Sequence, residues 1–104
     1  MSLSPATVVQ LRYSWSVEFD WDGVNEGHIA RHGVSPEEAE EAMLDPDRVP
    51  ADAHWGPAGE RRGAFVGQTE GGRHLFVTFT LRGGILRVVT ARDATATEKR
   101  RYRR

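Results

Sequence analysis

The sequence predicts an α+β domain, in which a small antiparallel sheet is combined with two N-terminal helices and one C-terminal helix. Two helix-start signals occur between residues 22 and 44. Three apolar segments joined by glycine-containing tight turns follow them, and such turns join antiparallel strands. A last helix-start signal comes after these segments. The length of 104 residues allows one domain with one modest core.

The first regular element is expected after residue 15. Residues 1–15 carry no clear pattern, and we expect an N-terminal arm or an extra strand there. Residues 16–104 are expected to form a single domain. Within this domain, residues 16–21 alternate apolar and acidic side chains from Val17 onward, which indicates a half-buried strand.

A helix is expected over residues 22–32. Asp22 is a favourable N-cap residue, and Gly33 can end the helix in the left-handed conformation. Val24 and Ile29 are expected to form the apolar face of this helix.

A second and stronger start signal begins at Ser35. Ser35 can cap a helix, Pro36 suits its first turn, and Glu38 completes a capping box. Asp45 precedes a proline, which ends the helix because this position resists the helical conformation. The buried stripe is expected at three positions with i, i+3, i+4 spacing: Ala39, Ala42 and Met43.

The remaining chain is expected to form strands and one helix. Residues 48–53 form a doubtful strand because Pro50 lacks a backbone donor, and residues 54–60 read as a loop. Three strands are expected over residues 63–69, 74–81 and 85–92. In the last strand, alternation assigns three residues to each face: Arg87, Val89 and Ala91, against Val88, Thr90 and Arg92.

The last eighteen residues, 87–104, contain seven basic side chains. Thr95 and Glu98 form a capping box that starts the C-terminal helix. This density of positive charge predicts a polyanion or an acidic partner on that surface.

Charge is distributed unevenly along the chain. Residues 1–60 hold three basic and twelve acidic side chains, whereas residues 61–104 hold eleven basic and three acidic ones. The basic half forms a binding surface if the fold exposes it on one face. The alternative is that the two halves pair with each other.

Several functional classes are disfavoured by the sequence. There is no cysteine, so thiolate chemistry and disulfides are excluded. No apolar run approaches the length of a membrane span, and the N-terminus does not resemble a secretory signal, so we expect a cytoplasmic protein without membrane partners. No dinucleotide or Walker loop is present, and we expect no cofactor. His28 and His32 share a helix face, but without a third ligand we expect no metal.

The candidate functional residues are mostly basic. Arginine binds phosphate through a forked, always charged group, and several arginines can stabilise a phosphoryl transition state without metal. The candidate catalytic residues are Arg62, Arg87, Arg92 and Glu98. The further candidates for binding a polyanion, which would be RNA-binding residues if that polyanion is RNA, are Arg61, Lys99, Arg101 and Tyr102.

The roles of individual candidates stay open at this point. Glu98 is a weak candidate for a general base because neighbouring cations lower a carboxyl pKa, and capping is its simpler role. Tyr102 can stack on a base, but an aromatic on a helix more often anchors that helix to the core. The group that would act as general base remains unassigned among His74, Glu98 and a bound water.

The order and spacing of several short motifs resemble the BrnT family of toxins. The motifs are Phe19-Asp20-Trp21-Asp22, Asn25, His32-Gly33-Val34, Arg62 to Gly67, Arg87 to Arg92, and Ala94 to Tyr102. The chain departs from the family at residues 26–31, which lack the usual lysines, and at Thr90, where serine is common.

This resemblance implies a RelE-like fold and a ribonuclease activity that inhibits translation in bacteria. It also implies neutralisation by a cognate antitoxin with a ribbon-helix-helix domain, with oligomers formed only with that antitoxin. The functional set implied by position is Arg62, Arg87, Arg92, Glu98 and Arg101.

The leading hypothesis is therefore a metal-independent endoribonuclease toxin of a type II toxin–antitoxin system. One alternative is a non-catalytic module that binds RNA or an acidic protein segment. Another is an inactive toxin relative that acts only within an antitoxin repressor complex.

Overall fold

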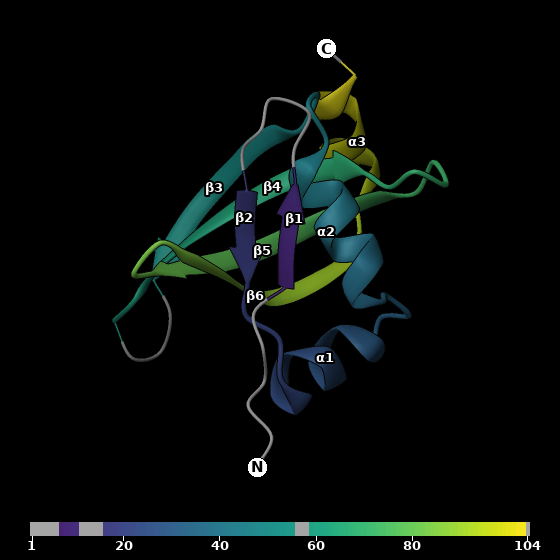
Figure 1. Ribbon diagram of the computed structural model, residues 1–104. Coiled ribbons are helices and arrows are strands. Elements are labelled where there is room, and N and C mark those ends of the chain that lie inside the picture. Colours follow the sequence, from purple (N-terminus) through teal and green to yellow (C-terminus); the bar gives the residue numbers. More distant parts are fainter. Residues whose placement is uncertain (1–6, 11–15, 56–58, 104) are drawn as a thin grey trace.

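The computed structural model describes residues 7–10, 16–55 and 59–103, and it confirms the α+β class (Figure 1). Within these ranges, six strands form one sheet in the order β1-β2-β6-β5-β4-β3. The elements are β1 (Thr7–Gln10), β2 (Ser16–Phe19), α1 (Gly23–Ala30), α2 (Pro36–Leu44), β3 (Val49–Trp55), β4 (Arg61–Gln68), β5 (His74–Arg82), β6 (Ile85–Asp93) and α3 (Ala96–Tyr102).

The sheet is mixed rather than purely antiparallel. Its neighbouring strands pair antiparallel except β2 and β6, which run parallel where Phe19 lies opposite Leu86. These two strands are far apart in the chain, so no tight turn imposes the antiparallel direction on them. The parallel pair brings the start of α1 next to β6.

All three helices begin where the sequence predicts. Asp22, Ser35 and Thr95 are the N-cap residues, and each forms a capping box with the residue three positions later. Gly33 has the expected left-handed conformation, with a φ of 68°. These features depend on neighbouring residues only, which explains why they are visible in the sequence.

Helices α1 and α2 cover one face of the sheet, with α1 against β6 and α2 against β4 and β5 (Figure 1). The predicted stripe of Ala39, Ala42 and Met43 is buried. It packs in one cluster with Leu75 and Val77 of β5. The close approach of α2 to the sheet depends on a glycine in β4, because a Cβ at Gly67 would collide with the backbone of α2.

The predicted apolar face of α1 is only half correct. Ile29 is fully buried, but Val24 is 73% exposed. The buried residue in the first turn of α1 is instead Asn25. Its amide bonds to the backbone of β6, so a polar contact replaces the expected apolar one.

Strand β6 does not follow the predicted alternation. The pairing with β5 shifts by one residue, so that Thr78 lies opposite Thr90 while Phe79 lies opposite Val88. Val89 is thus the extra residue of a β-bulge. As a result Val88 and Ala91 both point into the core, although alternation assigned them to opposite faces.

Strand β3 is real and longer than predicted. It extends to Trp55, so the predicted loop over residues 54–60 is wrong for its first two positions, and residues 56–58 lie outside the described part of the chain. Pro50 is tolerated because β3 is an edge strand. Among the described residues, no helix is long and apolar enough to cross a membrane.

Candidate active site

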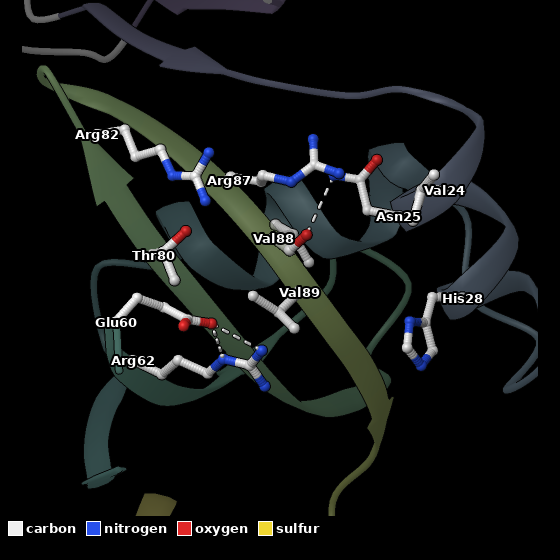
Figure 2. A pocket seen from close by; sticks show the side chains of 10 residues that line it. All are labelled: Val24, Asn25, His28, Glu60, Arg62, Thr80, Arg82, Arg87, Val88 and Val89. Atoms are coloured by element: carbon white, nitrogen blue, oxygen red, sulfur yellow. Dashed lines mark hydrogen bonds and ion pairs between the residues drawn. The ribbon is translucent and has the colours of Figure 1, made fainter. Parts of the chain in front are cut away.

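A pocket of about 260 Å³ lies between α1 and one end of the hairpins formed by β4, β5 and β6 (Figure 2). The chain enters β4, leaves β5 and enters β6 at this end. Ten residues line the pocket: Val24, Asn25, His28, Glu60, Arg62, Thr80, Arg82, Arg87, Val88 and Val89. Three of them are arginines and one is a carboxylate, so positive charge predominates in the lining.

Arg87 is held by two carboxylates from the first half of the chain. Its Nη1 lies 3.1 Å from Asp20 Oδ2 and 3.0 Å from Asp22 Oδ2, and its Nη2 donates to Asp22 Oδ1 at 3.1 Å. The parallel pairing of β2 with β6 brings these carboxylates to Arg87. The hydrogen bond from Arg87 is the main cause of the lowered pKa of Asp22.

Arg62 uses one edge of its guanidinium and leaves the other open. Its Nε and Nη2 donate to Glu60 Oε2 at 3.2 Å and 3.0 Å. Within the described part of the chain, Nη1 has no hydrogen-bond partner. The Arg62 side chain is 22% exposed, so an anion in the pocket can reach this open edge.

Arg82 is the least constrained cation of the pocket. It forms no ion pair or hydrogen bond with any residue that the structure describes. Gly83 and Gly84, both with positive φ, form the tight turn that places Arg82 opposite Ile85. Arg87 follows Ile85 by two positions on β6, so the two arginines lie near each other on paired strands. Two hairpin strands therefore present two guanidinium groups to one cavity.

Arg92 and Glu98 do not line this pocket. Arg92 Nη1 and Nη2 donate to the two carboxylate oxygens of Glu98 at 2.9 Å and 3.0 Å. The Arg92 guanidinium also lies over the Phe76 ring, 4.3 Å from its centroid. Of the three arginines among the candidate catalytic residues, the structure therefore brings Arg62 and Arg87 to one pocket and leaves Arg92 outside it.

Glu98 is fully engaged at the start of α3. Besides pairing with Arg92, its Oε1 accepts a hydrogen bond from the backbone of Thr95 at 2.8 Å. The hydrogen bond from Arg92 is the main cause of its lowered pKa. A carboxylate with a lowered pKa is a weak proton acceptor, so its geometry fits capping and pairing better than base catalysis.

The contacts of Tyr102 are those of an anchor. Its hydroxyl donates to Asp45 at 2.6 Å, and its ring meets His74 edge-on at 4.8 Å between centroids. Burial and the Asp45 carboxylate raise the pKa of Tyr102 to about 12. Burial, with Arg103 and Lys99 nearby, lowers the pKa of His74.

The other candidate RNA-binding residues lie outside the pocket. Arg61 is exposed and lines a separate depression with Phe79 and Leu81. Arg101 is also exposed, and its Nη2 donates to the carbonyl of Pro50 at 3.2 Å. Lys99 belongs to the basic last turn of α3. The predicted basic set is thus divided between the pocket and the α3 surface.

The two histidines considered as metal ligands separate in the structure. His28 lines the pocket, whereas His32 lies in the turn after α1. Within the described ranges, no three histidine, aspartate or glutamate side chains are grouped to hold a metal ion.

A family model described as "Ribonuclease toxin, BrnT, of type II toxin-antitoxin system" matches residues 21–98. The chain belongs to the BrnT family. The resemblance predicted from the motifs is therefore confirmed, and the family gives this chain RNA as substrate class and an antitoxin as partner. No curated protein shows a significant match to it.

The match to the BrnT family includes every residue that lines the pocket. Sequence reasoning selected Arg62 and Arg87 from this lining but missed Arg82 and Glu60. The sequence pattern places Arg82 in a tight turn and Glu60 at the end of a loop. Glu60 and Arg82 come together in one pocket only because β4, β5 and β6 pair side by side. One signal was available in the sequence, since Arg82 and Arg87 flank the same hairpin turn.

The pocket of this BrnT-family chain is suited to binding a phosphodiester. Arg82 and the open edge of Arg62 are both available as donors, and a forked guanidinium matches two phosphate oxygens.

Proposed function

We propose that this protein is a metal-independent endoribonuclease toxin that cleaves RNA and thereby inhibits translation in the cytoplasm. The observation that supports this proposal is the gathering of Arg62, Arg82 and Arg87 in one pocket. Arg82 and the open edge of Arg62 can supply what a divalent ion often supplies, namely stabilisation of a phosphoryl group as its charge increases. The RNA brings its own nucleophile, the ribose 2′-hydroxyl.

In the proposed reaction, the 2′-oxygen attacks the adjacent phosphorus and the bond to the 5′-oxygen of the next nucleotide breaks. Arg62 and Arg82 bind the non-bridging phosphate oxygens, and Arg87 on the neighbouring strand β6 completes the arginine lining while it is held by Asp20 and Asp22. Holding nucleophile and phosphate in line lowers the entropic cost of the reaction. Removing one such donor is expected to lower kcat by about 10²-fold to 10³-fold.

The α3 surface has a separate role in this proposal. Arg92, Lys99 and Arg101, with Arg61 on β4, contact phosphates of the flanking RNA. Glu98 orients Arg92, since the two form a bidentate pair. Tyr102 secures α3 through Asp45. Each phosphate contact removed should weaken binding of all RNA sequences and lower the salt dependence by about one unit of slope.

The antitoxin is proposed to be a small protein with a ribbon-helix-helix domain, encoded by an adjacent reading frame. Oligomers are proposed to form only in complex with it. Expressing both proteins together and measuring the mass of the purified toxin alone and of the complex tests this. A stable oligomer of the toxin alone would contradict the proposal.

The activity itself is tested by incubating the purified protein with RNA in excess chelator. We expect cleavage by the wild type and a loss of about 10²-fold or more in the Arg62→Ala variant. Arg31→Ala is the matched control, because Arg31 is an exposed arginine at the C-cap of α1 and does not line the pocket. Equal cleavage by wild type and Arg62→Ala would contradict the assigned pocket.

The ion pairs of the basic residues favour a second candidate function. Arg62, Arg87 and Arg92 each pair with a carboxylate of the same chain, and the partners of Arg62 and Arg87 come from the acidic first half. Such pairing supports a non-catalytic toxin relative that acts only in an antitoxin repressor complex. Growth arrest on expression without antitoxin, together with RNA cleavage, would exclude this candidate.

A further inference from the structure

We infer that Glu60 and His28 are the general base and the general acid of the proposed ribonuclease reaction. This inference rests on the proposed function and adds the residues that move protons. It assigns catalysis to two residues that sequence reasoning did not select for that role. It also leaves Glu98 and His74 out of proton transfer.

The chemistry requires two proton transfers that the arginines cannot perform. The 2′-hydroxyl must lose a proton as its oxygen attacks phosphorus, and the departing 5′-oxygen must gain one. A guanidinium remains protonated at any working pH, so it stabilises charge but does not act as a base. The pocket lining contains two side chains of the types that serve as general acids and bases in enzymes: Glu60 and His28.

Glu60 is positioned beside the phosphate-binding group. Two hydrogen bonds from Arg62, both to Oε2, fix its carboxylate next to the guanidinium. Its side chain is 27% exposed, so it is reachable from the cavity without being fully solvated. A ribose whose phosphate binds the open edge of Arg62 would bring its 2′-hydroxyl near this carboxylate.

His28 enters the pocket from the other wall. It lies on α1, whereas Glu60 lies just before β4, and in Figure 2 the Arg62 guanidinium is seen between their side chains. In-line displacement places the attacking and departing oxygens on opposite sides of phosphorus, so a base and an acid on opposite walls suit it. Within the described part of the chain, His28 has no hydrogen-bond partner that would occupy its ring nitrogens.

The position of His28 is fixed indirectly by Asn25, three residues earlier on α1. The Asn25 amide donates to the carbonyls of Asp20 and Val88 at 2.9 Å and 3.0 Å, which holds this turn of the helix against β6. Residues three apart lie on the same helix face, so the contact that buries Asn25 also directs His28 toward the pocket. The other candidate bases lack this placement, because neither Glu98 nor His74 lines the pocket.

The assigned step balances in protons and bonds. Glu60 takes the proton of the 2′-hydroxyl, and the bond between the 2′-oxygen and phosphorus forms. The bond between phosphorus and the 5′-oxygen breaks, and protonated His28 gives its proton to that oxygen. The products are a 2′,3′-cyclic phosphate and a free 5′-hydroxyl, and no oxidant, metal or other reactant is required.

The test compares two RNA oligonucleotides that contain the linkage cut by the wild type. One is ordinary RNA, and the other has sulfur in place of the departing 5′-oxygen at that linkage. A thiolate leaves without being protonated, so the sulfur substrate does not need the general acid. The variants are His28→Ala and Glu60→Gln, where glutamine still offers Arg62 an acceptor. His32→Ala and Glu70→Gln are matched controls, since both residues are exposed and neither lines the pocket.

We expect His28→Ala to cleave ordinary RNA about 10²-fold to 10⁴-fold more slowly and to cleave the sulfur substrate at the wild-type rate. Glu60→Gln should slow the cleavage of both substrates, and the controls should cleave both normally. Equal slowing of the two substrates by His28→Ala, or wild-type rates in either variant, would overturn the assignment while leaving the proposed function intact. No cleavage of ordinary RNA by the wild type would instead refute the proposed function. Circular dichroism of each variant shows whether it is folded.

Discussion

The side-chain amide of Asn25 donates a buried hydrogen bond to the backbone carbonyl of Val88 at 3.0 Å. This bond joins α1 to β6 across 63 positions of the chain. The same side chain donates to the carbonyl of Asp20 and accepts from the backbone of Asp22, where it completes the capping box. One short polar residue thus fixes the start of α1, its contact with the sheet and one wall of the pocket.

Replacing Asn25 with alanine should therefore destabilise the whole domain. Three hydrogen bonds are lost and the Val88 carbonyl is left buried without its partner, so the free energy of unfolding should fall by about 3 kcal/mol. Urea denaturation measures this change. Val24→Ala is the matched control. Val24 is the residue next to Asn25 and is 73% exposed, so its replacement should change the free energy of unfolding by less than about 0.5 kcal/mol. A loss of less than about 1 kcal/mol in Asn25→Ala would show that the bond has little structural value.

Replacing Arg87 should change the titration of Asp22. The hydrogen bond from Arg87 is the main cause of the lowered pKa of Asp22 in the folded protein, so Arg87→Ala should raise that pKa toward the ordinary value of 3.8. A lowered folded-state pKa stabilises the protein above the unfolded-state pKa, and this stabilisation is lost as the pH falls through the folded-state value.

The pH dependence below about 4 should consequently be weaker in Arg87→Ala than in the wild type. NMR titration of the Asp22 carboxyl and denaturation at several pH values measure the two effects. Arg31→Ala, at the C-cap of α1, should alter neither. An unchanged Asp22 pKa in Arg87→Ala would contradict the ion pair.

Adding a single methyl group at Gly67 should displace α2. A Cβ there would collide with the backbone carbonyl of Ala42, and backbone cannot move aside as a side-chain end can. Gly67→Ala should lower the free energy of unfolding by about 3 kcal/mol or more. Gly71→Ala is the control, since the nearest atom to its Cβ would be 3.8 Å away. Thermal unfolding of both variants provides the comparison, and equal midpoints would contradict the close packing of α2 on β4.

The two arginine regions should separate in enzyme kinetics. Under the proposed function, Arg62 acts on the reacting phosphate, whereas Arg92 lies outside the pocket and contacts flanking RNA. Arg92→Ala should therefore raise KM several-fold, leave kcat nearly unchanged and lower the salt slope by about one. Arg62→Ala should instead lower kcat by about 10²-fold. A large loss of kcat in Arg92→Ala would return Arg92 to the catalytic group.

The parts of the fold that were predictable are those decided by neighbouring residues. The caps at Asp22, Ser35 and Thr95 and the left-handed Gly33 depend on a few adjacent positions, so the sequence reveals them. The bulge at Val89 depends on pairing between two strands, and no local pattern announces it. The same is true of the parallel pairing of β2 with β6, which no turn dictates.

The pocket shows the same division. The chemistry of arginine was sufficient to select Arg62 and Arg87, and the structure brings both to one cavity. Arg92 also qualified by residue type, but it lies against Phe76 and Glu98 in the fold. The sequence left open whether the basic half pairs with the acidic half or forms a binding surface, and the structure shows both outcomes. Arg87 pairs with Asp20 and Asp22, whereas Arg82 has no ion pair among the described residues.

The central claim is that the arginine pocket promotes attack by the ribose 2′-hydroxyl without a metal ion. It is tested most directly with two RNA strands in excess chelator, identical except that one has a 2′-deoxyribose at the linkage that is normally cut. We expect the ordinary strand to be cleaved to a 2′,3′-cyclic phosphate and the deoxy-substituted strand to stay intact at that linkage. Cleavage of the substituted linkage, or cleavage that appears only when Mg²⁺ is restored, would contradict this account.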